Sequence, residues 1–207
     1  MRKRTGNLIV ISAPSGAGKT TLCQKLLQIM TDVKMSVSYT TRGARQEEAD
    51  GVHYSFISAE QFREMIGEGT FVEWAEVHGN YYGTSKLRIQ EILSSGADVI
   101  LDIDVQGARQ IRQHFPDSVH VFILPPSMDV LKRRLEGRMS DAPDVIVRRL
   151  LKARDEIRGY RDYNYVIIND IVDEALQELL SVVRAERARV ERFDHAWAAA
   201  SFLKEEQ

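Results

Sequence analysis

The chain has 207 residues, of which 43% are hydrophobic, so it can bury a substantial core as one domain or as a domain with insertions. A formal net charge of −2 excludes a global electrostatic footprint for nucleic acid or for an anionic membrane surface. The single cysteine, Cys23, excludes an internal disulfide and is predicted to be a small buried residue in a reducing compartment. No apolar run reaches the length of a membrane span or of a signal peptide, so we expect a soluble, cytoplasmic protein.

A short apolar strand, a glycine-rich loop and a helix open the chain. Strand 8–12 leads into Ala13-Pro14-Ser15-Gly16-Ala17-Gly18-Lys19-Thr20, and a helix is predicted over 19–30. Backbone amides in such a loop bind phosphate, while Lys19 can reach the β- and γ-phosphates and Thr20 can ligate Mg²⁺. The alternative is a plain turn before an ordinary helix, but the strand–loop–helix context favours a P-loop. Ala13 replaces the usual first glycine, which is tolerable only where φ need not be positive.

Predicted strands and helices then alternate, as in a parallel sheet covered on both faces. The expected strands are 36–40, 53–57, 71–77, 81–82, 99–104, 119–124 and 165–169. The expected helices are 59–67, opened by a Ser58–Gln61 capping box, then 85–94, 105–114, 130–137, 143–160 and one long helix from about 172. The segment 36–82 breaks this rhythm with several short strands, and an insertion at this edge of the sheet commonly builds half of an active site.

The insertion carries several candidate ligand-binding residues. Arg42 and Arg45 lie on a charged loop, where guanidinium groups suit a second phosphate, although internal pairs with the loop's acids are the alternative. Glu73 stands in an apolar, aromatic strand and could accept two donors from a base edge. Further along, Asp102 and Asp104 are two apart in a predicted strand, so they should share a face and could position Mg²⁺ through water, contact a substrate, or cap the next helix.

A basic stretch near residue 134 is the candidate lid. Arg134 and Arg138 are four apart and would share a helix face if the helix continues through Gly137. Neighbouring arginines such as Arg133 and Arg148 are better explained as a solvated basic face. Phosphoryl transfer requires positioning and charge neutralisation, which such arginines could supply.

Several of these motifs, in this order, resemble the signature of guanylate kinases, over about residues 8–187. They are the Thr-Thr-Arg segment at 40–42 with Arg45, Tyr54 and Phe56, then Glu73-Trp74-Ala75, Gly79-Asn80-Tyr81-Tyr82-Gly83 and 101–107. The Ala-Pro-Ser-Gly form of the loop is similar to bacterial members. Family members usually have Pro where Ala44 stands and often Gly where Glu47 stands, which bears on the rigidity of the phosphate-contacting loop.

The resemblance implies a three-layer α/β P-loop fold with a parallel sheet core, an inserted small mixed sheet that binds GMP, and a helical lid. It implies a kinase-like domain over 5–187, with a core at about 5–35, 93–126 and 160–187, a GMP-binding region at 36–92 and a lid at 127–159. Residues 188–207 form a C-terminal helical tail. The implied reaction is ATP-dependent phosphorylation of GMP, and of dGMP, within purine nucleotide metabolism.

The same resemblance assigns roles to individual residues. ATP is held by residues 13–20 and Asn169, with Lys19, Arg134, Arg138 and Arg149 acting on the transferring phosphate. The GMP phosphate is bound by Arg42, Arg45, Tyr54 and Tyr82. The guanine base is bound by Ser38, Glu73 and Thr84, and Asp102 also contacts GMP. Mg²⁺ is ligated by Thr20, and by Asp104 through water. The nucleotides are the only partners implied, and the oligomeric state stays open.

Three other functions are compatible with parts of the sequence. Asp104-Val105-Gln106-Gly107 fits a GTPase D-x-x-G pattern, but the chain has no Asn-Lys-x-Asp guanine motif. A non-catalytic binding module of the same family would have a degraded P-loop, whereas Lys19 and Thr20 are present. A kinase for a different phosphorylated acceptor is disfavoured by Ser38, Glu73 and Thr84 together.

Overall fold

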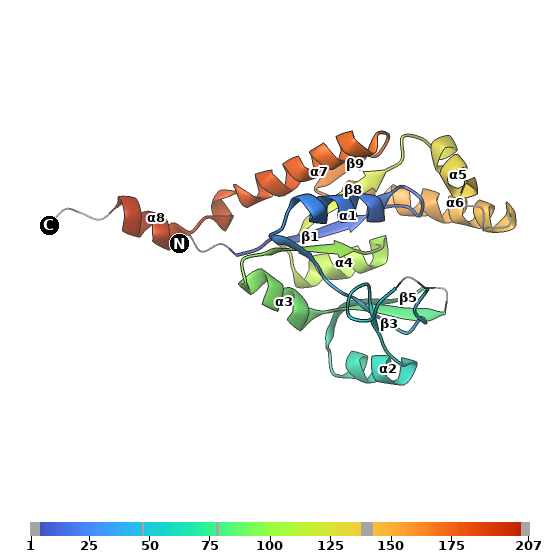
Figure 1. Ribbon diagram of the computed structural model, residues 1–207, viewed down its shortest axis with the longest axis horizontal. Helices are drawn as coiled ribbons and strands as arrows, with labels where there is room; N and C mark the ends of the chain where they lie inside the picture. Colours follow the sequence, from blue (N-terminus) through green and yellow to red (C-terminus); the bar gives the residue numbers. More distant parts are fainter. Residues whose placement is uncertain (1–4, 47, 78, 138–142, 204–207) are drawn as a thin grey trace.

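The computed structural model describes residues 5–46, 48–77, 79–137 and 143–203. It contains a larger parallel sheet and a smaller mixed sheet, together with the helices that surround them (Figure 1). The larger sheet is parallel throughout, with strand order β2-β7-β1-β8-β9. Its strands are β1 (Leu8–Ser12), β2 (Val33–Met35), β7 (Asp98–Asp102), β8 (Val119–Leu124) and β9 (Tyr165–Ile168). The parallel sheet confirms the predicted α/β class.

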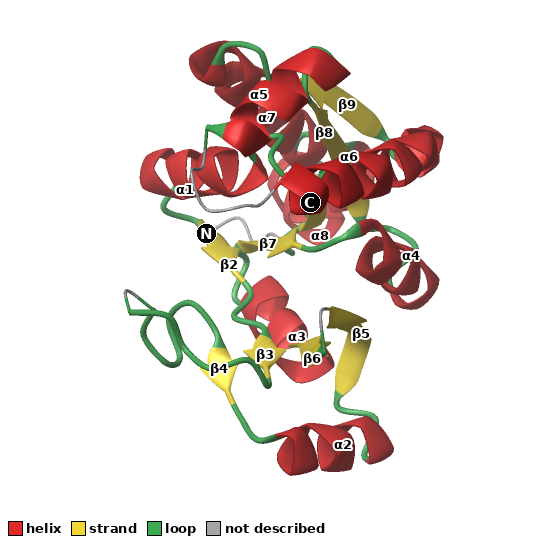
Figure 2. Ribbon diagram, turned by 90° about the vertical axis from the view of Figure 1, so that its right-hand side faces the viewer, coloured by secondary structure: helices red, strands yellow, loops and turns green. Residues whose placement is uncertain are grey.

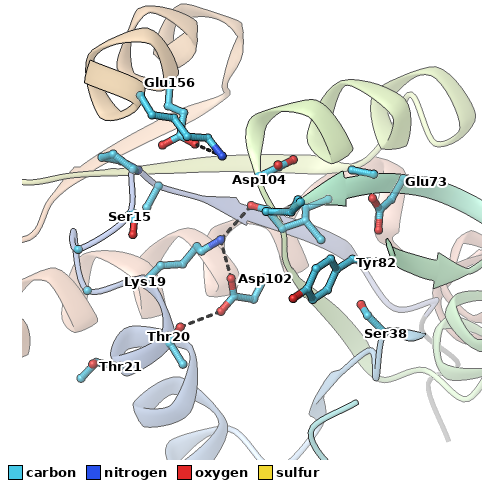
Figure 3. Close-up of a pocket in the computed structure, with 18 of the residues that line it drawn as sticks. Ser15, Lys19, Thr20, Thr21, Ser38, Glu73, Tyr82, Asp102, Asp104 and Glu156 are labelled. Atoms are coloured by element: carbon cyan, nitrogen blue, oxygen red, sulfur yellow. Dashed lines mark hydrogen bonds and ion pairs between the residues drawn. The ribbon is translucent and has the colours of Figure 1, made fainter. Parts of the chain in front are cut away.

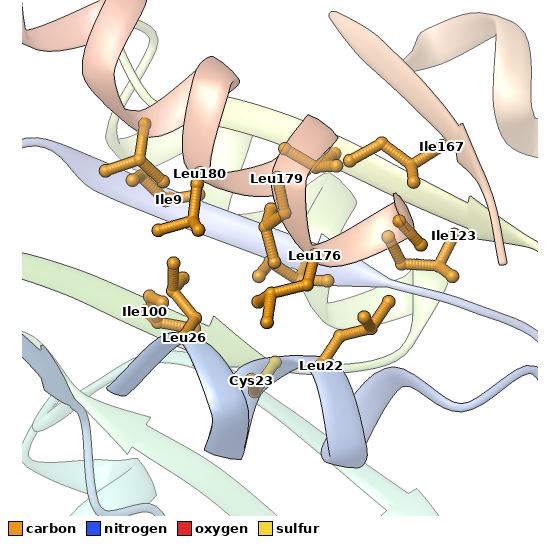
Figure 4. Packing of buried hydrophobic residues seen from close by; sticks show 14 of the residues in the cluster. Ile9, Leu22, Cys23, Leu26, Ile100, Ile123, Ile167, Leu176, Leu179 and Leu180 are labelled. Atoms are coloured by element: carbon orange, nitrogen blue, oxygen red, sulfur yellow. The ribbon is translucent and has the colours of Figure 1, made fainter. Parts of the chain in front are cut away.

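Helices cover both faces of the parallel sheet. On one face lie α1 (Lys19–Ile29) and α7 (Val172–Arg187), and on the other α3 (Lys86–Ser94) and α4 (Val105–His114). Alternate residues of β1 explain the two layers, because Ile9 and Ile11 belong to the cluster with α1 and α7 while Leu8 and Val10 face α3 and α4. Figure 4 shows Ile9 with Leu22, Leu26 and Leu180 in the first cluster, where Cys23 is buried as predicted.

The smaller sheet is mixed and lies to one side of the larger sheet, with α2 (Ala59–Gly67) on its far side (Figure 2). Its strand order is β4-β3-β6-β5, and its strands are β3 (Tyr39–Thr40), β4 (Ser55–Phe56), β5 (Phe71–Val77) and β6 (Asn80–Ser85). Ser58 and Gln61 form the predicted capping box at the start of α2. The inserted small mixed sheet is therefore present over the segment expected for it.

A pair of helices forms a third unit beside the P-loop. They are α5 (Met128–Glu136) and α6 (Pro143–Ile157), followed by a 3₁₀ turn at Arg158–Asp162. Leu131, Leu135 and Ala153 form their own small core, separate from the two clusters of the parallel sheet. This pair occupies the segment predicted as a helical lid.

Several predicted elements differ from the structure in their bounds. Of the strand expected at 36–40, only Tyr39–Thr40 forms a strand, and it pairs in the smaller sheet. Strand β2, which pairs with β7 over Val33–Met35, was not predicted. Strand β6 runs from Asn80 to Ser85, so it is longer than the strand predicted at 81–82. The long C-terminal helix ends at Arg187, and a 3₁₀ turn at Val190–Arg192 separates it from α8 (His195–Phe202), which projects from the body (Figure 1). None of the helices in the described residues is long and apolar enough to cross a membrane.

Candidate active site

A cleft of about 450 Å³ opens where the carboxyl ends of β1 and β7 face the smaller sheet. This volume suits a small ligand. Figure 3 shows the P-loop side chains on one side of the cleft and those of the smaller sheet on the other. Among the predicted site residues, the cleft is lined by Ala13, Pro14, Ser15, Gly16, Gly18, Lys19, Thr20, Ser38, Tyr54, Glu73, Tyr82, Asp102 and Asp104. Segments far apart in sequence thus meet in one concave site.

The P-loop has the backbone geometry that its glycines predict. Gly16 and Gly18 have φ values of 94° and 92°, a region that disfavours residues with a Cβ. A Cβ on Gly18 would also lie 2.3 Å from Nδ2 of Asn169. Asn169 is 1% exposed and donates a hydrogen bond from Nδ2 to the Ala17 carbonyl at 2.7 Å. In this structure Asn169 therefore stabilises the loop through its hydrogen bond to the Ala17 carbonyl. Its predicted contact with adenine stays a prediction.

Ala13 and Ala17 pack the loop against the hydrophobic core. Both are buried, and both belong to the hydrophobic cluster shared by α1 and α7. The methyl group of Ala13 thus packs into the core while its residue borders the cleft. The replacement of the usual glycine is accommodated by this packing.

Asp102 connects the two polar side chains that follow the loop. Its Oδ1 lies 2.6 Å from Nζ of Lys19, and its Oδ2 accepts a hydrogen bond from the Thr20 hydroxyl at 3.1 Å. Lys19 also donates to the Ile103 carbonyl at 3.0 Å. Figure 3 shows these contacts at the floor of the cleft. Asp102 is therefore placed against the phosphate-binding side, although its predicted role was on the GMP side.

The cleft offers oxygen ligands that suit Mg²⁺. Among the described residues no group of three or more His, Cys, Asp or Glu side chains could hold a metal ion. Mg²⁺ is usually bound by one or two protein oxygens, with waters and substrate phosphates completing the octahedron. The neighbouring Thr20 hydroxyl and Asp102 carboxylate fit that pattern.

Asp104 differs from the prediction. Strand β7 ends at Asp102, so the two carboxylates do not share the face of one strand. Asp104 is instead the N-cap of α4, and its Oδ1 accepts hydrogen bonds from the amides of Gln106 at 3.0 Å and Gly107 at 2.9 Å. The capping alternative therefore holds, because the amides at a helix start need acceptors. Asp104 still borders the cleft.

Glu73 is buried in the smaller sheet with two hydroxyl neighbours. It pairs with Thr84 across β5 and β6, and the Thr84 hydroxyl donates to Glu73 Oε1 at 2.5 Å. The Ser38 and Thr84 hydroxyl oxygens are 3.2 Å apart. Burial raises the pKa of Glu73 to about 7, with the Thr84 hydrogen bond acting in the opposite direction. Three predicted base-reading residues are thus contiguous, although Thr84 lies behind Glu73 and does not line the cleft.

Arg42 and Arg45 are both tied to Glu48. Arg42 pairs with Glu48 Oε1 at 2.8 Å, and the Arg45 amide donates to Glu48 Oε2 at 2.8 Å. Arg42 holds the pKa of Glu48 at about 2, mainly through their hydrogen bond. The alternative of an internal side-chain pair is therefore realised for Arg42, whereas Arg45 contacts Glu48 through its backbone amide. The Arg42 guanidinium also lies 5.6 Å from the centre of the Tyr54 ring, which lines the cleft.

The lid arginines reach different parts of the P-loop side. Arg149 donates from Nη2 to the Ser15 hydroxyl at 2.8 Å, and Arg134 donates to the Asn169 carbonyl at 2.9 Å. Helix α5 ends at Glu136, so the condition for Arg134 and Arg138 to share a helix face is not met. Arg138 itself lies outside the described residues. Arg148 pairs with Asp144 and is well exposed, as expected for a solvated face.

A second hollow of about 560 Å³ lies between the lid and the phosphate loop. It is lined by Ser15, Arg45, Val145, Arg148, Arg149, Lys152 and Glu156. Lys152 and Glu156 border both hollows and were not predicted. Burial raises the pKa of Glu156, and a hydrogen bond from the Ser15 amide acts against that rise. The signal was available in the sequence, since Lys152 and Glu156 follow Arg149 at helical spacing.

Comparisons with known proteins agree with this geometry. The family model for guanylate kinase matches residues 5–186. A guanylate kinase of Geobacter metallireducens is 53% identical over 93% of this chain and 98% of its own length. That of Dechloromonas aromatica is 55% identical over 87% of this chain and 89% of its own. The crystal structure of guanylate kinase from Anaplasma phagocytophilum superimposes with a TM-score of 0.81 at 33% identity, covering 100% of both chains.

Proposed function

The chain belongs to the guanylate kinase family and catalyses the ATP-dependent phosphorylation of GMP to GDP, and we propose that its cleft holds the two nucleotides in separate halves. The P-loop forms the half for ATP, and the smaller sheet forms the half for GMP. The observation that carries this division is the burial of Glu73 beside the Thr84 hydroxyl, with Glu73, Ser38 and Lys19 lining the same cleft. A P-loop hydrolase would need no such second polar pocket.

The ATP half relies on backbone amides and on Lys19. Backbone N–H groups of the loop and of the start of α1 bind the phosphates, and Lys19 neutralises the charge that develops on them. Its contacts with Asp102 and the Ile103 carbonyl hold the ammonium group at the floor of the cleft. Bound Mg²⁺ would neutralise phosphate charge, with Thr20 as its direct ligand and Asp102 or Asp104 as acceptors for its waters.

The GMP half reads the base through Glu73. Guanine presents N1–H and N2–H₂ side by side, and a carboxylate can accept from both, while Ser38, which lines the cleft, can donate to O6. Thr84 is proposed to act on the base through Glu73, to which its hydroxyl donates. Adenine has an acceptor at N1 and no 2-amino group, so Glu73 would lose both bonds. Unpaired polar groups of this kind can reject a wrong substrate by as much as about 10⁴-fold.

Four side chains are proposed for the GMP phosphate, namely Arg42, Arg45, Tyr54 and Tyr82. Tyr54 and Tyr82 pack edge to face with ring centres 5.9 Å apart, and both line the cleft. Arg42 adjoins Tyr54, while Arg45 faces the second hollow together with Arg149. The phosphate would therefore replace the Glu48 carboxylate as the partner of the Arg42 guanidinium.

Transfer takes place where the two halves meet. Arg149, Arg134 and Arg138 of the lid are proposed to reach the transferring phosphate, and a closed lid excludes the water that would hydrolyse ATP. None of the proposed contacts reads the ribose 2′-hydroxyl, so dGMP is expected to be a substrate as well. A cytoplasmic location is proposed from the single buried cysteine and the nucleotide substrates.

The experiment is a coupled assay of ADP release with ATP and one acceptor at a time. GMP and dGMP should both support turnover, while AMP and ribose 5-phosphate should not, because neither offers Glu73 its two donors. Equal turnover with AMP would overturn the assignment of Glu73 to the base. A preference for GMP over dGMP of more than about tenfold would show that the 2′-hydroxyl is read.

A further inference from the structure

Helix α4 of the core holds the exposed edge of the smaller sheet. Strand β5 is the last strand of that sheet, so one side of its backbone has no strand partner. At Trp74, the side chain of Gln110 on α4 makes the hydrogen bonds that a neighbouring strand would make. Its Nε2 donates to the Trp74 carbonyl at 2.9 Å, and its Oε1 accepts from the Trp74 amide at 3.2 Å. One side-chain amide thus satisfies both backbone groups of the residue next to Glu73.

Gly107 brings the same helix against the Glu73 carboxylate. A Cβ on Gly107 would lie 2.7 Å from Glu73 Oε2 and 3.4 Å from the Ile103 side chain. Gly107 and Gln110 are three residues apart, so they lie on one face of α4. That face therefore meets β5 twice, once at the side chain of Glu73 and once at the backbone of Trp74.

Resting on the proposed role of Glu73, we infer that Gly107 and Gln110 are positioning residues that set the selectivity for guanine. Fixing both backbone groups of Trp74 fixes the direction in which the adjacent Glu73 side chain leaves the strand. The absence of a side chain on Gly107 leaves room for Oε2 beside the start of the helix. A displacement of about 1 Å in such an arrangement can cost on the order of 10²-fold in rate.

The same segment also contacts the ATP half. It begins at Asp102, which touches Lys19 and Thr20, and continues through the cap of α4 at Asp104 to Gln110. Nine consecutive residues, 102–110, therefore connect the P-loop to β5, the strand that carries Glu73.

The test compares the activity with GMP to the activity with IMP. IMP lacks the 2-amino group whose hydrogen bond the Glu73 carboxylate would accept. Gln110→Met keeps the length and helix preference of the side chain but removes both hydrogen bonds. Gly107→Ala places a methyl group against Oε2. Both variants should lower the ratio of kcat/KM for GMP to that for IMP by about threefold to tenfold, with KM for ATP changed less than about twofold. Gln113→Met, at an exposed position of the same helix, should leave the ratio unchanged.

The ratio is measured on one enzyme sample, so it does not depend on how much of a variant is folded. A merely structural role would reduce both activities equally and leave the ratio intact, which would overturn the inference. Glu73→Gln serves as the reference variant and should reduce the ratio most. If Glu73→Gln does not reduce it, the proposed reading of guanine fails; if only Glu73→Gln reduces it, the positioning role alone fails.

Discussion

The two halves of the cleft are built in opposite ways. The proposed ATP half consists of eight consecutive residues, 13–20, which connect strand β1 to the first turn of helix α1 and offer mainly backbone N–H groups. The proposed GMP half is made of side chains from four strands or their flanks, and Ser38 and Thr84 are 46 residues apart. A phosphate chain needs only an array of donors, whereas a base edge needs donors and acceptors at defined separations. Recognition of the triphosphate is therefore local, and recognition of guanine depends on the tertiary fold.

Removing Lys19 should have the largest effect, because it tests the charge at the centre of the ATP half. Lys19→Ala should reduce kcat by more than about 10³-fold, the upper range for losing one group that stabilises developing charge. The coupled assay measures the loss, and circular dichroism verifies the fold. Lys25→Ala, on the same helix but exposed in a pair with Asp173, should be nearly normal. Turnover of Lys19→Ala close to that of the parent would remove this residue from the mechanism.

Removing Glu73 should separate the two halves. Glu73→Ala should lower kcat/KM for GMP by about 10²- to 10³-fold while KM for ATP changes little, since the lost hydrogen bonds involve only the base. Steady-state titration of each nucleotide at saturating levels of the other gives both values. Glu76→Ala provides the matched control, because Glu76 lies exposed on the same strand. Equal losses for the two nucleotides would contradict a role confined to guanine.

Arg149 tests the junction between the halves. Arg149→Ala should lower kcat by roughly 10²-fold, the scale for one donor to a developing charge, and should change both KM values less. Arg158→Ala is a suitable control, because Arg158 is exposed and paired with Asp155 just beyond α6. An unchanged kcat in single-turnover measurements would assign Arg149 to the support of Ser15 alone.

The smallest expected effect is a pH dependence confined to the GMP half. Burial raises the pKa of Glu73 to about 7, so below that pH the group is protonated and cannot accept both guanine donors. Between pH 6 and pH 8 the ionised fraction rises about tenfold, and GMP affinity should rise with it. Calorimetric titration of GMP at several pH values measures the change.

Glu73→Gln isolates this titration, because its side chain does not ionise. The variant retains any pH dependence that arises from the GMP phosphate or from other groups. The difference between the parent and the variant should therefore carry the tenfold change. Identical pH profiles would place the titration elsewhere.

Sequence patterns predicted elements best where local signals act together. Strands β1, β5 and β8 and helix α4 have the predicted bounds, and the Ser58 capping box starts α2 at the predicted residue. Local sequence patterns did not predict the bounds of strands whose formation depends on which neighbouring strand they pair with. Strand β2 exists because Val33–Met35 lies against β7, and the strand predicted at 36–40 is interrupted as the chain passes from one sheet to the other.

By itself the sequence determined the P-loop, the alternating α/β order and the residue types of both half-sites, because these depend on short spacings and on side-chain chemistry. Tertiary structure alone decided where those residues act. It made Asn169 a support for the loop, placed Lys152 and Glu156 at the cleft, and set Gly107 and Gln110 against β5. The physical reason is that each of these residues acts on a partner that is distant in the sequence, and such partners are brought together only by the packing of distant segments.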